Sequence, residues 1–262
     1  MITSSVVASG YRPARQRITT ETKAALAAMT VQPSEKRIFV YDVAIRSLKA
    51  AGLWSKLGWL SLLAAHDEQA GRLNLVAPSQ VMTAVNSPGF TVDHGFKGDG
   101  ASSYLVLALP PAMGMAAGNA AFGAGVRTGG TTVNPLIGQV SGTNSFEILW
   151  PSNASSRFTG RMNSATAVTF GAVTSRAGRF VMSKVATDTT SGYLNGALVQ
   201  SVAAATESDL STQANPTTLF RQGSTYADDE VSFVHFGKGM TAPDVAAFDA
   251  IMTTYLQGVG AA

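Results

Sequence analysis

The sequence predicts a mainly β protein: an antiparallel sandwich or jelly roll, with a helical segment at its N-terminal end and an amphipathic helix at its C-terminal end. Three observations predict this class. After Val76, short runs of β-forming residues are separated by Gly, Pro, Asn and Ser. Before Val76 the apolar residues recur with a helical period, and that period returns near the C-terminus. Hydrophobic residues make up 45% of the 262 residues, which is enough to build a core.

The N-terminal part divides into an arm, residues 1–19, and a helical segment, residues 20–75. Within that segment, Glu21 to Met29 is rich in Ala and Leu and contains no helix breaker. The next helix is expected to start at Pro33–Glu35, because Pro and an acidic residue favour the first turn. A further helical stretch is expected from Leu53 to Ala65. The apolar face of the helix that follows Glu35 is formed by Ile38, Tyr41, Ile45 and Leu48.

Residues 76–262 are expected to form the jelly roll together with its terminal helix. Strands at this density, separated by turn signals, are typical of antiparallel sandwiches and jelly rolls. The expected strands are Phe90–Val92, Ser103–Ala108, Phe122–Arg127, Phe146–Trp150, Thr166–Val173, Arg179–Val185, a strand at Tyr193, Leu198–Val202, Thr218–Arg221 and Val231–Phe236.

Two local signals in this region are specific. Asn195 and Gly196 lie between two short β-forming runs, and Asn-Gly is the preferred pair for a two-residue type I′ hairpin. Near the C-terminus, Thr241 is expected to cap a helix with Pro243 and Asp244 in its first turn. The apolar face of that helix consists of Val245, Phe248, Ile251, Met252 and Tyr255.

Composition excludes several classes of function. The chain has no cysteine, so disulfides, thiolate catalysis and cysteine-type zinc sites are excluded. A net charge of +3 is too small to favour a nucleic acid partner. No apolar stretch is long enough for a membrane span, and the N-terminus lacks the basic start of a secretory signal. We expect no cofactor.

Two parts of the chain resemble known families. The phrases "SGYLNGALV" and "VSFVHFGKGMTAPDVAAFDAIMTTYL" resemble the closing half of the concanavalin A-like lectin/glucanase (laminin-G-like) jelly roll. The phrases "GLWSKLGWLSLLAAHDEQAGRLNLVAPS" and "TAVNSPGFTVDHGFKGDGASSYL" are similar to tailed-phage and prophage structural proteins. The resemblance implies a lectin-like jelly roll in a phage particle, made in the cytoplasm of a bacterial host.

The sequence offers no pattern for glycoside hydrolysis. A glucanase on this fold needs two carboxylates across a cleft, and alternate spacing on one strand would supply them. Glu147 stands alone in "SFEILWP", and the acidic residues of "ADDE" at 227–230 are adjacent on a turn. We interpret that cluster as a polar turn, with a catalytic or metal-binding role as the alternative. No catalytic residue and no metal ligand is therefore assigned.

The histidines and one glycine-rich turn are further candidates for a metal or catalytic site. His66, His94 and His235 lie far apart and have no partner at helical spacing, which favours structural roles. In "GFKGDGASS" Asp99 could bind calcium with backbone oxygens, but a tight turn is the preferred interpretation.

Aromatic and arginine side chains supply the candidate contact residues. Trp150 and Tyr226, with Phe158, could stack on sugar rings if exposed, the alternative being core packing. The arm carries possible assembly contacts, because guanidinium groups pair with carboxylates and backbone oxygens of neighbours. These residues are Tyr11, Arg12, Arg15 and Arg17.

Taken together, the residues and the resemblance suggest a non-enzymatic virion structural protein, either a head decoration or a tail or fibre component. Its expected partners are copies of itself, with a trimer favoured, and other virion proteins. The alternative is a carbohydrate-binding adhesin that recognises a glycan on the host surface, and a glycan depolymerase is the third hypothesis. Only 13% of the residues are charged, which favours self-association.

Overall fold

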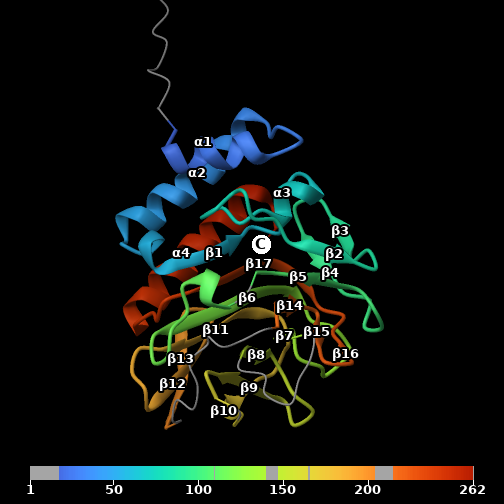
Figure 1. Ribbon diagram of the computed structural model, residues 1–262, viewed down its shortest axis with the longest axis vertical. Coiled ribbons are helices and arrows are strands. Elements are labelled where there is room, and N and C mark those ends of the chain that lie inside the picture. Colours follow the sequence, from blue (N-terminus) through green and yellow to red (C-terminus); the bar gives the residue numbers. More distant parts are fainter. Residues whose placement is uncertain (1–17, 109, 140–146, 165, 204–214, 262) are drawn as a thin grey trace, which may run out of the picture.

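The computed structural model of the chain is a sandwich of two antiparallel sheets with its helices on one side (Figure 1). It describes residues 18–108, 110–139, 147–164, 166–203 and 215–261. The predicted fold class is confirmed: the protein is mainly β, with helices before the sandwich and a helix after it. The predicted boundaries between arm, helical segment and jelly roll stay predictions.

The larger sheet has eight strands. They are β1 (Leu57–Ser61), β3 (Gly89–Thr91), β4 (Gly95–Lys97), β6 (Ala120–Thr128), β11 (Gly178–Lys184), β12 (Thr189–Leu194), β13 (Ala197–Ala203) and β17 (Glu230–Gly237). Their order is β13-β12-β11-β6-β17-β4-β3, and β1 also pairs with β17. The last strand of the chain, β17, therefore lies inside the sheet, with β6 along one edge and β1 and β4 along the other.

The smaller sheet has seven strands. They are β2 (Thr83–Val85), β5 (Tyr104–Val106), β7 (Ile137–Gln139), β8 (Glu147–Trp150), β9 (Arg157–Met162), β10 (Val168–Ala172) and β14 (Thr217–Leu219). Their order is β10-β9-β8-β7-β14-β5-β2. A separate two-stranded ribbon, β15 (Arg221–Gln222) and β16 (Thr225–Tyr226), follows β14 directly.

The first hydrophobic core fills the space between the two sheets. It is rich in phenylalanine, and the rings are in direct contact: the Phe158 centroid lies 4.8 Å from that of Phe170 and 5.2 Å from that of Phe180. Phe158, one of the aromatics considered for sugar stacking, is fully buried here. It is therefore a core residue and cannot contact a ligand.

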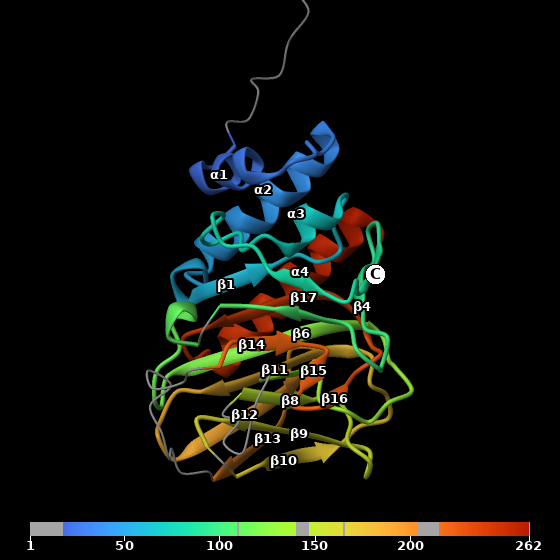
Figure 2. The same cartoon turned by 45° about the vertical axis from the view of Figure 1, so that its right-hand side comes forward.

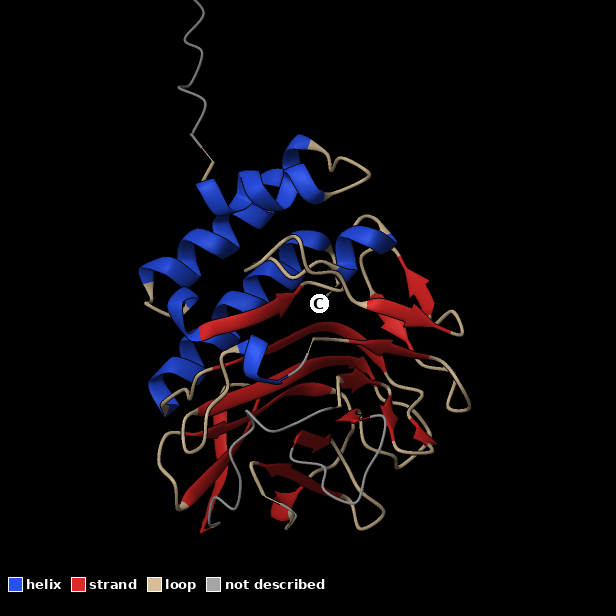
Figure 3. Cartoon of the chain, viewed as in Figure 1, coloured by secondary structure: helices blue, strands red, loops and turns tan. Residues whose placement is uncertain are grey.

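The second core lies between the outer face of the larger sheet and the helices. The helices are α1 (Thr20–Ala28), α2 (Glu35–Ala50), α3 (Glu68–Arg72) and α4 (Ala242–Val259), with short 3-10 turns η1 (Trp54–Lys56) and η2 (Pro110–Met113). Figures 2 and 3 show α1 and α2 above the strands and α4 running obliquely behind β1. Tyr41 of α2, Phe233 of β17, and Phe248 and Tyr255 of α4 form the centre of this core. The helices thus cover one sheet of the sandwich and leave the other sheet's outer face to the rest of the chain.

The predicted helix starts are confirmed by their caps. Ser34 caps α2 by accepting a hydrogen bond from the backbone N–H of Arg37. Thr241 caps α4 in a capping box with Asp244, as its sequence predicts. Among the described residues, no helix has the length and apolar character that crossing a membrane requires.

The predicted hairpin is confirmed as well. Leu194 pairs with Ala197, so Asn195 and Gly196 form a two-residue connection between β12 and β13. Their φ angles are 50° and 78°, the left-handed values that a type I′ turn requires at both positions.

The predicted helix from Leu53 to Ala65 is wrong. Only η1 is helical there, and Leu57–Ser61 form strand β1. This strand is buried on both faces, with Trp59 in the first core and Leu60 in the second. A strand buried on both faces shows a continuous apolar run instead of an alternating one, so periodicity could not distinguish it from a helix.

Gly58 is needed where β1 passes η2, because a Cβ added there would lie 1.9 Å from the carbonyl oxygen of Met113. We expect Gly58→Ala to lower the free energy of unfolding by about 1–3 kcal/mol, the usual cost of overpacking. The matched control is Gly89→Ala, whose Cβ would meet its nearest atom at 3.8 Å. Equal urea midpoints for the two variants would contradict the close packing of β1 on η2.

Phe248 anchors α4 on the larger sheet and is 1% exposed. Its ring centroid lies 6.0 Å from that of Phe233 and 4.5 Å from that of His235. We expect Phe248→Ala to cost about 3–5 kcal/mol, because it leaves a cavity in the second core. The measurement is urea denaturation. Val185→Ala, which shortens a side chain that is 59% exposed, serves as the control and should change the urea midpoint little. A loss below about 1 kcal/mol for Phe248→Ala would refute this role for α4.

Candidate functional site

The outer face of the smaller sheet carries both aromatic residues that the sequence suggested as sugar contacts. In β8 the side chain of Leu149 is fully buried in the first core. Successive side chains of a strand point to opposite faces, so Trp150 lies on the outer face, where it is half-buried. It pairs across the strands with Thr159 of β9.

Tyr226 lies in a cluster with Tyr104 and Arg221. The guanidinium carbon of Arg221 lies 4.6 Å from the Tyr104 ring centroid and 5.6 Å from the Tyr226 centroid. The two tyrosine centroids are 6.2 Å apart. Arg221 also donates a hydrogen bond from Nε to the carbonyl oxygen of Gly223 at 2.8 Å. The cation is therefore held between two rings in one orientation by cation–π contacts and a backbone acceptor.

The ribbon that carries this cluster lies across strand β7. A Cβ added to Gly138 would come within 2.4 Å of Gln222 Oε1 and 2.7 Å of the Arg221 carbonyl oxygen. The backbone N–H of Gln139 donates to the same Gln222 Oε1 at 2.9 Å. The missing side chain at Gly138 thus lets the ribbon β15–β16 approach the outer face of the sheet.

Strand β9 adds arginines to this face. Phe158 and Met162 point into the first core, so Arg157, Thr159 and Arg161 point outward. The Nε of Arg161 is buried and has no hydrogen-bond partner. We call Tyr104, Trp150, Arg161, Arg221 and Tyr226 the outer-face cluster.

The strand order of the sheet sets the distance between Trp150 and Arg161 on one side of the cluster and Tyr104, Arg221 and Tyr226 on the other. Arg161 of β9 pairs with Ile148 of β8. Strand β7, which pairs with β8 on its other side, carries Gly138 under the ribbon. Neighbouring strands lie ~4.8 Å apart, so the backbones at Arg161 and Gly138 are separated by about 10 Å. The Arg221 guanidinium, however, lies over Tyr104 of β5, four strands and about 19 Å from β9, so only an extended oligosaccharide could touch both halves.

The acidic turn at 227–230 has a structural role. Asp228 accepts hydrogen bonds from the backbone N–H and hydroxyl groups of Thr131 and Thr132, and those bonds hold its pKa well below the usual range. Asp229 is fully buried and accepts two hydrogen bonds from Arg176, at 2.9 and 2.5 Å. Both carboxylates are thus occupied by hydrogen-bond donors of the protein, which leaves neither of them open for a metal ion or a substrate.

Glu230, the last acid of that turn, pairs with Arg127 at 3.0 Å. Glu147 lies in β8, where its backbone pairs with Met162. Asp99 closes its own turn by accepting hydrogen bonds from the backbone N–H groups of Ala101, Ser102 and Ser103. These donors lower the Asp99 pKa and take the place that a calcium ion would need.

The histidines are dispersed. His66 Nε2 lies 2.9 Å from the carbonyl oxygen of Val31, and His94 Nδ1 lies 3.9 Å from Glu230 Oε1. His235 is fully buried beside Phe248, and burial lowers its pKa to about 3, so it is neutral. No group of three or more His, Cys, Asp or Glu residues in the described part of the chain could hold a metal ion.

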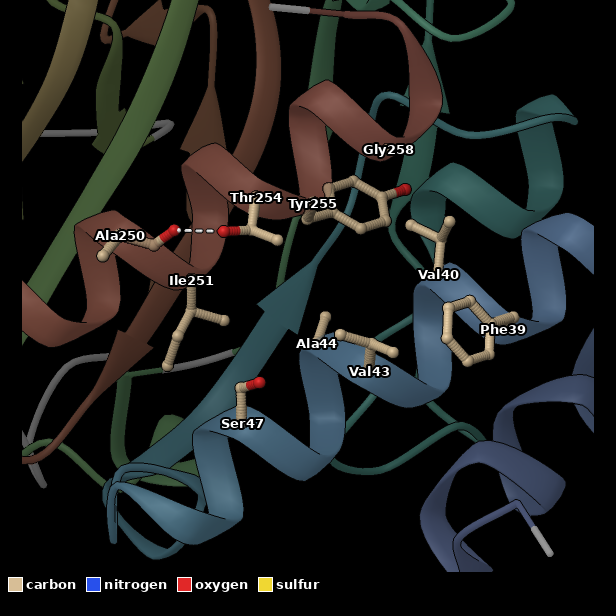
Figure 4. Close-up of a pocket in the computed structure, with 10 residues that line it drawn as sticks. All are labelled: Phe39, Val40, Val43, Ala44, Ser47, Ala250, Ile251, Thr254, Tyr255 and Gly258. Atoms are coloured by element: carbon tan, nitrogen blue, oxygen red, sulfur yellow. Dashed lines mark hydrogen bonds between the residues drawn. The ribbon is translucent and has the colours of Figure 1, made fainter. Parts of the chain in front are cut away.

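A pocket of about 300 Å³ lies on the other side of the molecule, between α2 and α4 (Figure 4). Phe39, Val43 and Ile251 line it, together with Tyr255, whose hydroxyl donates to the carbonyl oxygen of Ala64. Its lining lacks carboxylates, histidines and cations, so the pocket offers no acid–base chemistry and no fixed charge. Sequence reasoning missed it because its two walls lie about 200 residues apart in the chain.

The predicted assembly contacts Tyr11, Arg12, Arg15 and Arg17 lie outside the described residues. The homo-oligomer, the trimer and the role of the arm therefore stay predictions. Sequence reasoning also missed Tyr104, Arg161 and Arg221 as members of the outer-face cluster. No local pattern marks these three residues, because their placement on one face depends on strand pairing between distant segments.

Several solved structures resemble the fold. A mutant of Trypanosoma rangeli sialidase with trans-sialidase activity matches with a TM-score of 0.55 and 10% identity over 83% of this chain. Trypanosoma rangeli sialidase in complex with sialic acid matches with a TM-score of 0.54 and 11% identity over 83% of this chain. This chain spans 39% of the length of either of these two proteins.

Domain 4 of the Geobacillus stearothermophilus arabinanase AbnA, in complex with arabinotriose, matches with a TM-score of 0.47 and 10% identity, over 74% of this chain and 98% of that domain. No protein-family model and no curated protein sequence matches this chain.

The comparisons correct the expected function. The predicted non-enzymatic virion structural protein is contradicted, because the solved structures that resemble the chain include sialidases, one of them bound to sialic acid. The phage part of the resemblance finds no support in these structures. At 10–11% identity they show the fold alone, so any activity has to be argued from the chain's own residues. The chain has a lectin-like β-sandwich fold.

Proposed function

We propose that the chain is a carbohydrate-binding protein that recognises a cell-surface glycan through the outer-face cluster. One observation carries this proposal: Tyr104, Trp150 and Tyr226 lie with two arginines on the sheet face that the helices leave free. The fold that the chain shares with the sialidases supports it as context.

The chemistry of the cluster suits a sugar. Aromatic rings offer flat apolar surface for the C–H face of a pyranose, and arginines donate several hydrogen bonds to hydroxyl oxygens. Arg221 is already held by two rings and by Gly223, so little side-chain entropy would be lost on binding. All three aromatic side chains are half-buried, which fixes their orientation and still leaves part of each ring for contact.

Binding without cleavage is the proposal that the carboxylates favour. Glycoside hydrolysis requires two carboxyl groups across the bond, one of them able to donate a proton. The acidic turn next to the ribbon has its carboxylates bound by Thr131, Thr132, Arg176 and Arg127. None of these acids is placed to protonate a leaving group.

We expect Tyr226→Ala and Trp150→Ala each to weaken glycan binding by about tenfold, which corresponds to ~1.4 kcal/mol of lost ring contact. The measurement is titration calorimetry with an oligosaccharide that the wild-type protein binds on a glycan array. The matched control is Phe39→Ala, which removes a ring 56% exposed on the helix side and should leave affinity unchanged.

Two results would contradict the proposal. One is wild-type affinity in both cluster variants, with circular dichroism showing that they are folded. The other is loss of binding in Phe39→Ala, which would move the site to the pocket between α2 and α4.

A further inference from the structure

The arginines in residues 18–261 that the structure describes fall into two groups. Arg37, Arg46, Arg72, Arg127, Arg176 and Arg179 each form an ion pair with a carboxylate. Within the described part of the chain, the arginines that form no ion pair are Arg157, Arg161 and Arg221.

The unpaired arginines all belong to one surface. Arg157 and Arg161 both lie on β9, four residues apart, so their side chains point to the same, outer face of the sheet. Arg221 lies on the ribbon over Gly138, two strands away from Arg161. In a chain with so few charged residues, three cations without carboxylate partners on one sheet face form a local positive field.

The surroundings of two of these arginines point to a ligand. Arg161 Nε is buried without a hydrogen-bond partner, and a buried charged donor left unsatisfied costs free energy. The one side-chain hydrogen bond of Arg221 in the described structure uses Nε, which leaves both terminal nitrogens for a ligand. The guanidinium fork matches the two oxygens of a carboxylate or a sulfate ester, and that match is bidentate and charge-assisted.

We propose that the glycan bound by the outer-face cluster carries anionic groups, carboxylates or sulfate esters, and that Arg161 and Arg221 each pair with one of them while the aromatic rings hold the sugar. This inference rests on the proposed function, because it names the ligand class of the same site. Arg157, which is exposed at the start of β9, adds long-range attraction.

The test compares matched charged and neutral ligands on the wild-type protein. The pairs are 3′-sialyllactose with lactose, oligogalacturonate with its methyl ester, and a sulfated with an unsulfated galactan oligosaccharide. We expect one charged member to bind at least about tenfold more tightly than its neutral partner, with an affinity that falls as salt rises from 50 to 500 mM. The pair that shows this difference also distinguishes a carboxylate from a sulfate ester.

Variants then locate the charge recognition. Arg161→Gln and Arg221→Gln should each weaken binding of the charged ligand by about tenfold and binding of the neutral ligand by a clearly smaller factor, because Gln still donates a hydrogen bond to a sugar hydroxyl but carries no charge. Lys23→Gln, which removes an exposed cation from α1, is the control for net charge and should change neither affinity. Thermal melts would show that the arginine variants are folded.

The outcomes separate this inference from the proposed function. Equal affinity for the charged and neutral members, or wild-type charge preference in both arginine variants, would overturn the inference and leave glycan binding standing. Binding to no sugar at all would overturn both. Tighter binding of a single-stranded DNA oligonucleotide than of any glycan, lost in the same arginine variants, would assign the face to nucleic acid instead and also overturn the inference.

Discussion

The structure depends on one strand, β17, that is buried on both of its faces. Val234 and Phe236 point into the core between the sheets, and Phe233 and His235 point toward α4. Burying side chains on both faces needs space in the neighbouring strand β6. Glycines provide that space: a Cβ at Gly125 would lie 2.3 Å from the Phe233 ring, and a Cβ at Gly123 would lie 2.8 Å from His235 Nε2.

This constraint decides which surface is left for function. The outer face of β17 packs against α4, so the helices cover the larger sheet (Figure 2). The smaller sheet keeps an outer face on which Trp150 and Arg161 can point outward and on which the ribbon with Arg221 and Tyr226 can lie. The glycan-binding proposal follows from this division of the two faces, and the likeness to sialidases contributes only the fold.

Much of the fold could be predicted from local patterns, because caps and tight turns are decided by a few neighbouring residues. Asn195-Gly196 and the Thr241 capping box are examples. Strand β1 could not be predicted, since burial on both faces removes the alternation that marks a strand. The residue types of Trp150 and Tyr226 mark them as candidates, but the placement of Arg161 and Arg221 on the same face depends on register between distant strands, which no local pattern reveals.

The central claim is that ligand binds the outer face of the smaller sheet. Amide hydrogen exchange, measured with and without an oligosaccharide that the protein binds on a glycan array, tests it most directly. We expect the ligand to slow exchange in residues 147–150, 157–162 and 221–226, which form β8, β9 and the ribbon, and to leave exchange in α2 and α4 unchanged. Slower exchange confined to α2 and α4, around the apolar pocket, would contradict it.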